Sequence, residues 1–352
     1  MKRRTVLALS AVIIAALVAA PACSPASLVP VSDIAIAGST FAEPLYVKQF
    51  DAWYQKTQVK TVYGAITSAG AIRALQDRTV DIGATDVLLS AEEQTQLPFS
   101  VLHIPTCLGA VAVCVNLPGN PSLRFDASLL SAVFRGDVKN WNDARIASLN
   151  PLVVLPDKPV VVVHRADSSG TTAVVTTYLS AVDEVWREKV GAGRIVQWKS
   201  GIGGKGNAGV TALIRQTSGS IGYVQYAYAV EAGLNCIALR NRAGAFAEPS
   251  VASIQAAVPA DMPSNLQTTL LDRAGDSTYP IVSFTWLVLY REQSYDNRPR
   301  ARAQAIHSLL KWLLGEGQTL AEPLSYGSLP PAIRKAALQI VEQMTWQGEA
   351  VN

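Results

Sequence analysis

The sequence is poor in the residues that build metal centres. It has three histidines and four cysteines among 352 residues, and they form no cluster with metal-ligand spacing. It also has no fixed-period repeat and no low-complexity tract, which argues against solenoid and disordered architectures. Hydrophobic residues make up 49% of the chain, enough for a sizeable core, and the length suits two lobes. We therefore expect a globular protein without a metal or other cofactor.

The N-terminus carries the pattern of a signal peptide. Residues 1–22 combine a basic start, Lys2-Arg3-Arg4, with an apolar run and small residues. The end of this leader is similar to a bacterial lipobox, so we predict lipid attachment at Cys23 and a tether over residues 23–30. The alternative is cleavage by the general signal peptidase, which would leave Cys23 as an unpaired thiol.

The mature chain lacks net charge. The leader holds three basic residues and no acid, so 27 Lys and Arg remain against 27 Asp and Glu. No broad basic field is left to attract nucleic acid or an anionic membrane surface. Any anion must therefore be held by local donors.

Three cysteines follow the tether. Cys107 and Cys114 lie in one apolar stretch, and on a continuous strand they would face opposite ways and could not pair. A bond between Cys114 and Cys236 across strands is possible. Buried free thiols are the alternative, and both interpretations stay open.

Strand and helix patterns alternate along the chain. Apolar, β-branched runs predict strands at 33–37, 59–66, 80–84, 102–115, 160–163, 221–224 and 280–290. Amphipathic spacing predicts helices between them, including 173–182, 226–231, 303–314 and 331–344. The alternation indicates an α/β protein with mainly parallel sheets. Ligands of such sheets bind at the carboxyl ends of the strands.

Three polar turns follow predicted strands at that edge. They are Gly38-Ser39-Thr40-Phe41, Thr67-Ser68-Ala69-Gly70 and the segment 165–172. Each opens a predicted helix, and a helix N-terminus offers unpartnered N–H groups at the positive end of the helix dipole. The third turn adds Arg165, whose forked donors suit an anion. The turns together predict an anion site.

Each turn also has a purely structural interpretation. Thr40 and Glu43 fit a capping box. Ser68 could be a plain N-cap, and Asp167 or Ser169 could cap the third helix. The recurrence of such turns along the chain favours the anion site over three ordinary caps.

Six motifs occur in the order typical of one family. They are 37-AGSTF-41, 80-VDIGATD-86, 141-WND-143, 165-RADSSGT-171, 203-GGKGN-207 and 222-GYV-224. Through them the chain resembles the phosphate-binding proteins of bacterial high-affinity phosphate ABC transporters. The resemblance covers nearly the whole mature chain and implies a two-lobed, type II periplasmic-binding-protein fold with a ligand cleft between the lobes. It assigns residues 31–107 and 281–352 to lobe 1 and residues 108–280 to lobe 2.

The resemblance also implies how phosphate is held. Asp86 would accept a hydrogen bond from a phosphate O–H, Arg165 would supply positive charge, and Asp167 would orient that guanidinium. The other phosphate-binding groups would be hydroxyls and backbone N–H groups of Thr40, Phe41, Ser68, Ser169, Gly170 and Thr171. Desolvated phosphate would thus be held by preorganised hydrogen-bond donors rather than by the net charge of the protein.

Four positions depart from the family pattern. Glu43 stands where a small residue or proline is usual, and it would weaken anion binding if it pointed toward the cleft. Thr67 and Ala71 replace glycines around the second turn and could change how closely that backbone approaches the ligand. His164 replaces a frequent arginine, and we interpret it as a strand-end residue rather than a ligand.

The implied function is extracytoplasmic phosphate capture for permease subunits of an ABC transporter. We expect a monomer without nucleic acid, exported to the periplasm or held as a lipoprotein at the outer face of the cytoplasmic membrane. One alternative is a binding protein for sulfate or molybdate, and another is a phosphatase-type enzyme. His164, Asp167 and Ser169 lie within one short turn, too local for a catalytic triad, and no nucleophile elbow occurs. We therefore expect no catalytic residues.

Overall fold

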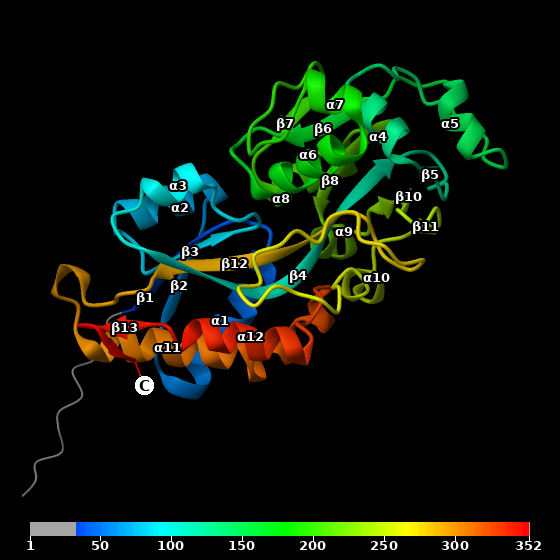
Figure 1. Cartoon of the computed structure of the whole chain (residues 1–352). Coiled ribbons are helices and arrows are strands. Elements are labelled where there is room, and N and C mark those ends of the chain that lie inside the picture. Colours follow the sequence, from blue (N-terminus) through cyan, green and yellow to red (C-terminus); the bar gives the residue numbers. More distant parts are fainter. Residues whose placement is uncertain (1–32, 352) are drawn as a thin grey trace, which may run out of the picture. The chain divides into compact units, whose positions relative to one another are not determined.

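A nine-stranded sheet organises residues 33–351, which are the residues that this computed structural model describes. The strand order is β2-β1-β3-β12-β4-β8-β6-β7 (Figure 1). The short strand β9 also pairs with β4. The strands are β1 Ile34–Gly38, β2 Thr61–Ala65, β3 Ile82–Thr85, β4 Val101–Asn116, β6 Val161–Arg165, β7 Ile202–Gly204, β8 Ser220–Gln225, β9 Asn235–Cys236 and β12 Val282–Tyr290. The predicted signal peptide, the tether and Cys23 lie outside the described residues.

The sheet is parallel toward its two ends and antiparallel in its centre. β1 pairs in parallel with β2 and β3, and β6 pairs in parallel with β7 and β8. The long strands β4 and β12 run antiparallel to each other, and β12 to β3 and β4 to β8. The predicted α/β fold is confirmed, and its parallel pairing holds in the two outer parts of the sheet.

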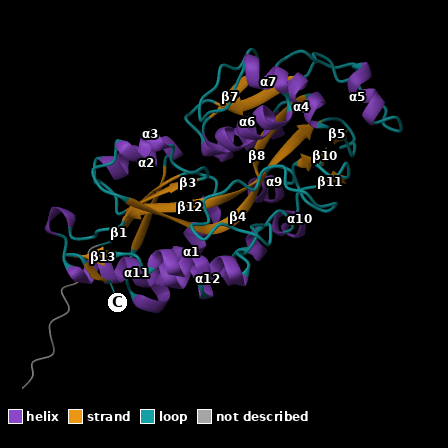
Figure 2. Cartoon of the chain, in the orientation of Figure 1, coloured by secondary structure: helices purple, strands orange, loops and turns teal. Residues whose placement is uncertain are grey.

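Most helices lie where the sequence predicts them. They are α1 Glu43–Thr57, α2 Ser68–Gln76, α3 Ala91–Thr95, α4 Ala127–Phe134, α5 Ala144–Leu149, α6 Gly170–Val182, α7 Glu184–Lys189, α8 Gly206–Gln216, α9 Tyr226–Glu231, α10 Val251–Gln255, α11 Arg300–Leu314 and α12 Pro331–Val341. Helices α11 and α12 pack side by side (Figure 2). Between residues 33 and 351, no helix is long and apolar enough to span a membrane.

Short elements complete the description. Small strands are β5 Arg124–Phe125, β10 Ala238–Arg240, β11 Phe246–Ala247, β13 Thr345–Trp346 and β14 Glu349–Ala350. Single 3₁₀ turns are η1 Tyr295–Asn297, η2 Glu316–Leu320 and η3 Glu322–Leu324. None of these elements carries a predicted site residue, so the large sheet and the helices that follow its strands position the site.

Strand β4 can cross the centre of the sheet because nearly all of its residues are apolar. Every residue from 102 to 115 is buried, which matches the predicted apolar run. The first part of β4 pairs with β12, and the part from Val111 onward pairs with β8. The pairing with β12 shifts register between Thr285 and Trp286, opposite Cys107 and Pro105. One continuous strand therefore connects the two parallel parts of the sheet.

Cys114 and Cys236 are direct neighbours across strands. They face each other in the β4–β9 pair, and their sulfur atoms lie 3.2 Å apart as a thiol hydrogen bond. Neither forms a disulfide in this structure, and Cys107 is likewise a free, buried thiol. Of the two interpretations that the sequence leaves open, this structure has the free thiols, with Cys114 and Cys236 adjacent.

Candidate anion-binding site

The first polar turn follows β1, and its hydroxyls contact other parts of the chain. Thr40 Oγ1 accepts hydrogen bonds from the Asn207 backbone N–H at 3.2 Å and from Asn207 Nδ2 at 3.0 Å. Ser39 Oγ donates to Asp86 Oδ2. The Phe41 N–H donates to Ser39 Oγ at 3.1 Å. A ligand that took the predicted Phe41 donor would have to share it with Ser39.

The alternative interpretation of Thr40 and Glu43 as a capping box is wrong. Helix α1 begins at Glu43 with Ala42 as N-cap, and no side chain caps it. Pro44 occupies the first turn, where its fixed φ and missing N–H are tolerated. The chain therefore makes an extra turn after Thr40 before it becomes helical. The Thr40 hydroxyl is not used for capping and faces Asn207 instead.

The second polar turn leaves a serine hydroxyl unused. Thr67, not Ser68, is the N-cap of α2, and Thr67 Oγ1 accepts a hydrogen bond from the Gly70 N–H at 2.8 Å. The interpretation of Ser68 as a plain N-cap is therefore wrong. Ser68 is fully buried, and its Oγ has no hydrogen-bond partner within residues 33–351. A buried hydroxyl without a partner is costly in an apolar setting, which makes Ser68 a candidate ligand-binding group.

The third polar turn places a buried arginine against an aspartate. Arg165 Nε and Nη2 donate to the two Asp167 oxygens at 2.7 and 2.6 Å, and Nη1 lies 3.4 Å from Thr171 Oγ1. The Arg165 side chain is only 2% exposed. Burial opposes ionisation of Asp167, but the hydrogen bonds and charge of Arg165 outweigh it and lower its pKa. The two-pronged pair holds the guanidinium in one orientation.

Gly170 places the third turn against the second turn and the end of β3. It is the first residue of α6, whose N-cap is Ser169, with Ser169 Oγ accepting a hydrogen bond from the Thr172 N–H at 3.1 Å. A methyl group placed on Gly170 would overlap Asp86 Oδ2 and Ser68 Oγ, and it would lie 2.9 Å from Asp86 Cγ. The N-terminus of α6 therefore directly faces the second turn and the end of β3.

Asp86 is a buried carboxyl at the end of β3. Ser39 Oγ donates to its Oδ2, and Thr285 Oγ1 donates to its Oδ1 at 3.3 Å. Burial raises the pKa of Asp86 from its ordinary value of 3.8 to about 7, against the Ser39 hydrogen bond and the charge of Arg165. Near neutral pH this group can therefore exist as carboxylate or as carboxylic acid.

This pKa predicts how stability changes with pH in the protein without ligand. Between about pH 4 and 7 the folded Asp86 keeps a proton that the unfolded carboxyl releases. The free energy of unfolding should therefore fall as pH rises through this range, by up to about 4 kcal/mol from this group. Urea unfolding at several pH values should show that Asp86→Asn flattens this decrease. The control Asp51→Asn, at an exposed position, should leave it intact, and a wild-type slope in the Asp86 variant would contradict the assignment.

Asn207 is a central residue that sequence reasoning did not select. Its Nδ2 donates to Thr40 Oγ1 at 3.0 Å and to Thr171 Oγ1 at 3.3 Å, and its Oδ1 accepts the Gln225 N–H at 2.9 Å. The available signal was its position beside Gly206 at the start of α8, in a glycine-rich loop. Asn207 thus connects the first turn to the third.

Two further contacts connect distant segments beside these turns. The Tyr228 hydroxyl lies 2.9 Å from the Thr40 carbonyl and 3.0 Å from Glu43 Oε2, and these two acceptors share its single proton. Arg194 forms an ion pair with Glu93 of α3. The charge of Arg194 also lowers the pKa of Asp86, although burial dominates. Sequence motifs single out neither Tyr228 nor Arg194.

The geometry does not support hydrolytic chemistry by a local triad. The His164 ring stacks on Trp198 at 4.9 Å, and its Nδ1 contacts the Arg165 carbonyl at 3.0 Å. Asp167 is paired with Arg165, and Ser169 caps α6. Over residues 33–351, no group of three or more His, Cys, Asp and Glu side chains could hold a metal ion. These contacts agree with a strand-end role for His164.

Comparison with known proteins shows similarity to phosphate-binding proteins along most of the chain. Residues 24–316 match the PBP superfamily domain. The chain is 39% identical over 307 residues to the phosphate-binding protein PstS of Xylella fastidiosa (strain 9a5c), covering 85% of this chain and 82% of the relative. It is 36% identical to PstS of Haemophilus influenzae, covering 84% and 88%. The crystal structure of a phosphate-binding protein from Stenotrophomonas maltophilia shares the fold, with a TM-score of 0.66 at 16% identity and coverage of 88% and 93%.

Proposed function

Because the chain belongs to the PstS family of phosphate-binding proteins, we propose that it captures inorganic phosphate outside the cytoplasm. It would then deliver the ion to the permease subunits of a phosphate ABC transporter. The observation that carries this proposal is the convergence on Gly170, where α6 meets Ser68 and Asp86. Arg165, two residues away from its partner Asp167, supplies the buried positive charge. The protein acts as a binding protein and not as an enzyme.

The proposed site offers several hydrogen-bond donors and one acceptor, the Asp86 carboxylate, in a buried environment. Backbone N–H groups and hydroxyls of the turns would donate to phosphate oxygens: these come from Thr40, Phe41, Ser68, Ser169, Gly170 and Thr171. Helix N-termini stabilise the bound anion through their dipoles. Asp86 would accept the phosphate O–H, which an anion lacking a proton cannot offer.

Two lobes would close around the ion. We assign residues 31–107 and 281–352 to one lobe and residues 108–280 to the other, as the family resemblance implies. The β4–β12 pair connects them, and its register shift opposite Cys107 lies at the assigned boundary. Hydrogen bonds from Asn207 to Thr40 and from Tyr228 to Thr40 would then join the lobes on closure.

Calorimetric titration of the mature protein with phosphate and with sulfate tests the function. Tight phosphate binding at one ion per chain, with much weaker sulfate binding, is the expected result. Equal binding of sulfate would instead support the alternative of a general oxyanion-binding protein. Turnover of a chromogenic phosphate ester would support the phosphatase alternative.

Loss of the site's cation should weaken binding strongly. A charge-assisted hydrogen bond is worth roughly 1.5–3 kcal/mol, so Arg165→Ala should raise the phosphate dissociation constant about 10- to 100-fold or more. Asp167 would also lose its partner and add an unpaired negative charge. Arg145→Ala is a matched control because Arg145 pairs with Asp143, likewise two residues away, at an exposed position. An unchanged dissociation constant in the Arg165 variant would place the site elsewhere.

The proposed location is the outer face of the cytoplasmic membrane, or the periplasm if the lipid is absent. The leader of residues 1–22 and Cys23 support export and lipid attachment. A single acyl chain binds membranes only marginally, whereas several chains on one cysteine hold firmly. Cys23→Ser should therefore move the protein from the membrane fraction to the soluble fraction. Identical fractionation of variant and wild type would disprove the lipoprotein assignment.

A further inference from the structure

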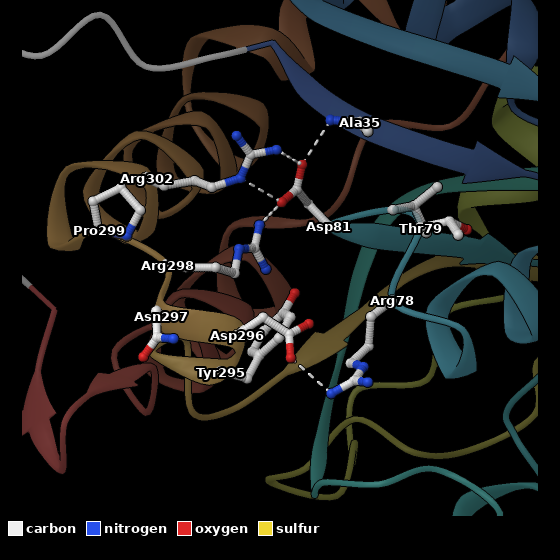
Figure 3. A pocket seen from close by; sticks show the side chains of 11 residues that line it. Ala35, Arg78, Thr79, Asp81, Tyr295, Asp296, Asn297, Arg298, Pro299 and Arg302 are labelled. Carbon is white, nitrogen blue, oxygen red and sulfur yellow. Dashed lines mark hydrogen bonds and ion pairs between the residues drawn. The ribbon is translucent and has the colours of Figure 1, made fainter.

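A second group of cations lies at the opposite ends of the strands that lead to the phosphate site. β1 and β3 begin beside a pocket of about 340 Å³, whose lining side chains are drawn in Figure 3. At their other ends these strands lead into the first turn and Asp86. The pocket is lined by Ala35, Arg78, Thr79, Val80, Asp81, Tyr295, Asp296, Asn297, Arg298, Pro299 and Arg302. None of these residues belongs to the proposed phosphate site.

One buried carboxylate in this pocket is shared by two guanidinium groups. Asp81 is 2% exposed and accepts the Ala35 N–H at 2.7 Å. Arg302 donates to both Asp81 oxygens, from Nε at 2.8 Å and from Nη2 at 2.7 Å. Arg298 Nη2 forms an ion pair with the same carboxylate. A single negative charge therefore faces two positive charges.

Arg298 is held firmly, but its donors are not all used. Its guanidinium lies over the Tyr295 ring at 4.4 Å, and its carbonyl accepts the Trp346 indole N–H at 2.9 Å. Nη1 is buried and has no hydrogen-bond partner within the described part of the chain. Burial, reinforced by the charge of Arg302, lowers the pKa of Arg298 to about 9. The fold thus holds a cation in a place that disfavours its charge.

The side chains at the rim of the pocket, Arg78 and Asp296, do not neutralise the positive charge of Arg298. Arg78 and Asp296 form an ion pair at 2.7 Å, and both side chains are nearly half exposed. In Figure 3 Arg298 lies between Asp81 and this pair. Three arginines face two aspartates in the pocket as a whole. The excess positive charge and the unused Nη1 donor both favour an anionic ligand.

We propose that this pocket binds a phosphate group, with Arg298 as its main ligand. Guanidinium groups match the paired oxygens of phosphate monoesters and diesters. The cavity is about ten times the ~30 Å³ share of one water molecule, so an organic group fits beside the phosphate. The source of the phosphate is either the headgroup of an anionic phospholipid or the free ion. The position of the pocket favours the lipid.

The pocket lies close to the start of the folded chain. Arg302 Nη2 donates to the Asp33 carbonyl at 3.1 Å. Cys23 precedes Asp33 by ten residues, which span at most about 36 Å when fully extended. If Cys23 carries a lipid, as proposed above, this short linker connects Asp33, the partner of Arg302, to the membrane anchor. The neutral mature chain has no broad basic surface, so a local pocket is the means by which it would contact an acidic headgroup.

Vesicle binding by an unanchored chain tests this proposal. The mature protein with Cys23→Ala is first loaded with one equivalent of phosphate. It is then sedimented with vesicles of equal parts phosphatidylglycerol and phosphatidylcholine, or of phosphatidylcholine alone. Arg298→Gln removes the main ligand, and Thr79→Glu adds a negative charge at an exposed rim position. Arg73→Gln removes one charge outside the pocket, at a side chain that is 79% exposed, and serves as the control.

We expect the wild type and the Arg73 control to bind the acidic vesicles about tenfold or more tightly than the two pocket variants. Glycerol phosphate should compete with the vesicles. The protein could instead fail to bind vesicles while calorimetry shows that a second phosphate ion binds and that this binding depends on Arg298. The pocket would then be an anion site, and its ligand would be the free ion. Equal vesicle binding by all variants, or no binding of either phosphate source, would overturn the proposal. If Arg298→Gln does not fold, the vesicle binding of Thr79→Glu alone decides the outcome.

Phosphate titration of the same variants distinguishes this inference from the proposed function, because it measures binding at the site of Arg165 and Asp86. The pocket variants should retain wild-type affinity there, because the pocket lies at the other ends of β1 and β3. If the wild type bound no phosphate at that site, the proposed function would fail, whereas the vesicle result would still decide the role of the pocket.

Discussion

Replacing Gly170 by alanine is expected to raise the phosphate dissociation constant about 100-fold or more. The added methyl group would overlap Asp86 Oδ2 and Ser68 Oγ, which both face the N-terminus of α6. Neither group can easily retreat, because both residues are fully buried. The methyl group would therefore hold α6 away from the end of β3 and from the second turn, and a ligand could not contact all three.

Calorimetry with phosphate, together with thermal unfolding, checks this expectation. Gly209→Ala is the matched control: it also adds a methyl group to a helical glycine, but its nearest neighbour would be at an ordinary 3.4 Å. The control should bind like wild type and be slightly more stable, because alanine favours the helix by up to about 1 kcal/mol. A Gly170→Ala variant that folds and keeps a phosphate affinity close to that of wild type would show that α6 does not close on the ligand.

Replacing Asp86 by asparagine is expected to reduce the selectivity for phosphate over sulfate by orders of magnitude. Phosphate near neutral pH still carries a proton that a carboxylate can accept, whereas sulfate offers only lone pairs and like charge. Such a repulsion in a dry site costs several kcal/mol. Asparagine can donate as well as accept, so Asp86→Asn removes the repulsion and keeps much of the phosphate affinity.

The decisive quantity is the ratio of the sulfate and phosphate dissociation constants in wild type and variant. The pH provides a second test. Because the pKa of Asp86 is near 7, lowering the pH converts this group to a carboxylic acid, which can donate a hydrogen bond to sulfate. The ratio of the sulfate to the phosphate dissociation constant in the wild type should therefore decrease as the pH is lowered from about 8 to 5.5, on either side of that pKa. In the variant, residue 86 does not titrate, so it should not change this ratio. An unchanged ratio in Asp86→Asn would remove the selectivity role from Asp86 and leave the phosphate assignment standing.

The sequence predicts those parts of the site that are encoded within short segments. Arg165 and Asp167 are two residues apart, and their pairing follows from one turn. The run 102–115 identifies a central strand because burial on both faces leaves only His103 and Thr106 as polar positions. The choice of cap was less predictable, since Thr67 and Ser68 are adjacent hydroxyl residues and the backbone path decides which one accepts the Gly70 N–H.

Contacts between distant segments could not be read from the sequence. Asn207 reaches Thr40 only because α8 and the turn after β1 meet in the folded chain. Asp81 meets Arg298 for the same reason, and no local pattern marks either residue as part of a pocket. The raised pKa of Asp86 likewise depends on burial by surrounding elements, which the sequence does not specify at any single position.

The central place of β12 has a consequence for biosynthesis. This strand lies between β3 and β4, although it comes from residues 282–290 near the end of the chain. Pairs such as Trp286 with Thr85 join segments that leave the ribosome far apart in time, and such non-local pairing makes folding slow. The sheet cannot be completed until almost all of the chain has been synthesised. A nascent polypeptide with a signal peptide would thus stay incompletely folded, as translocation requires, at least until this strand has been synthesised.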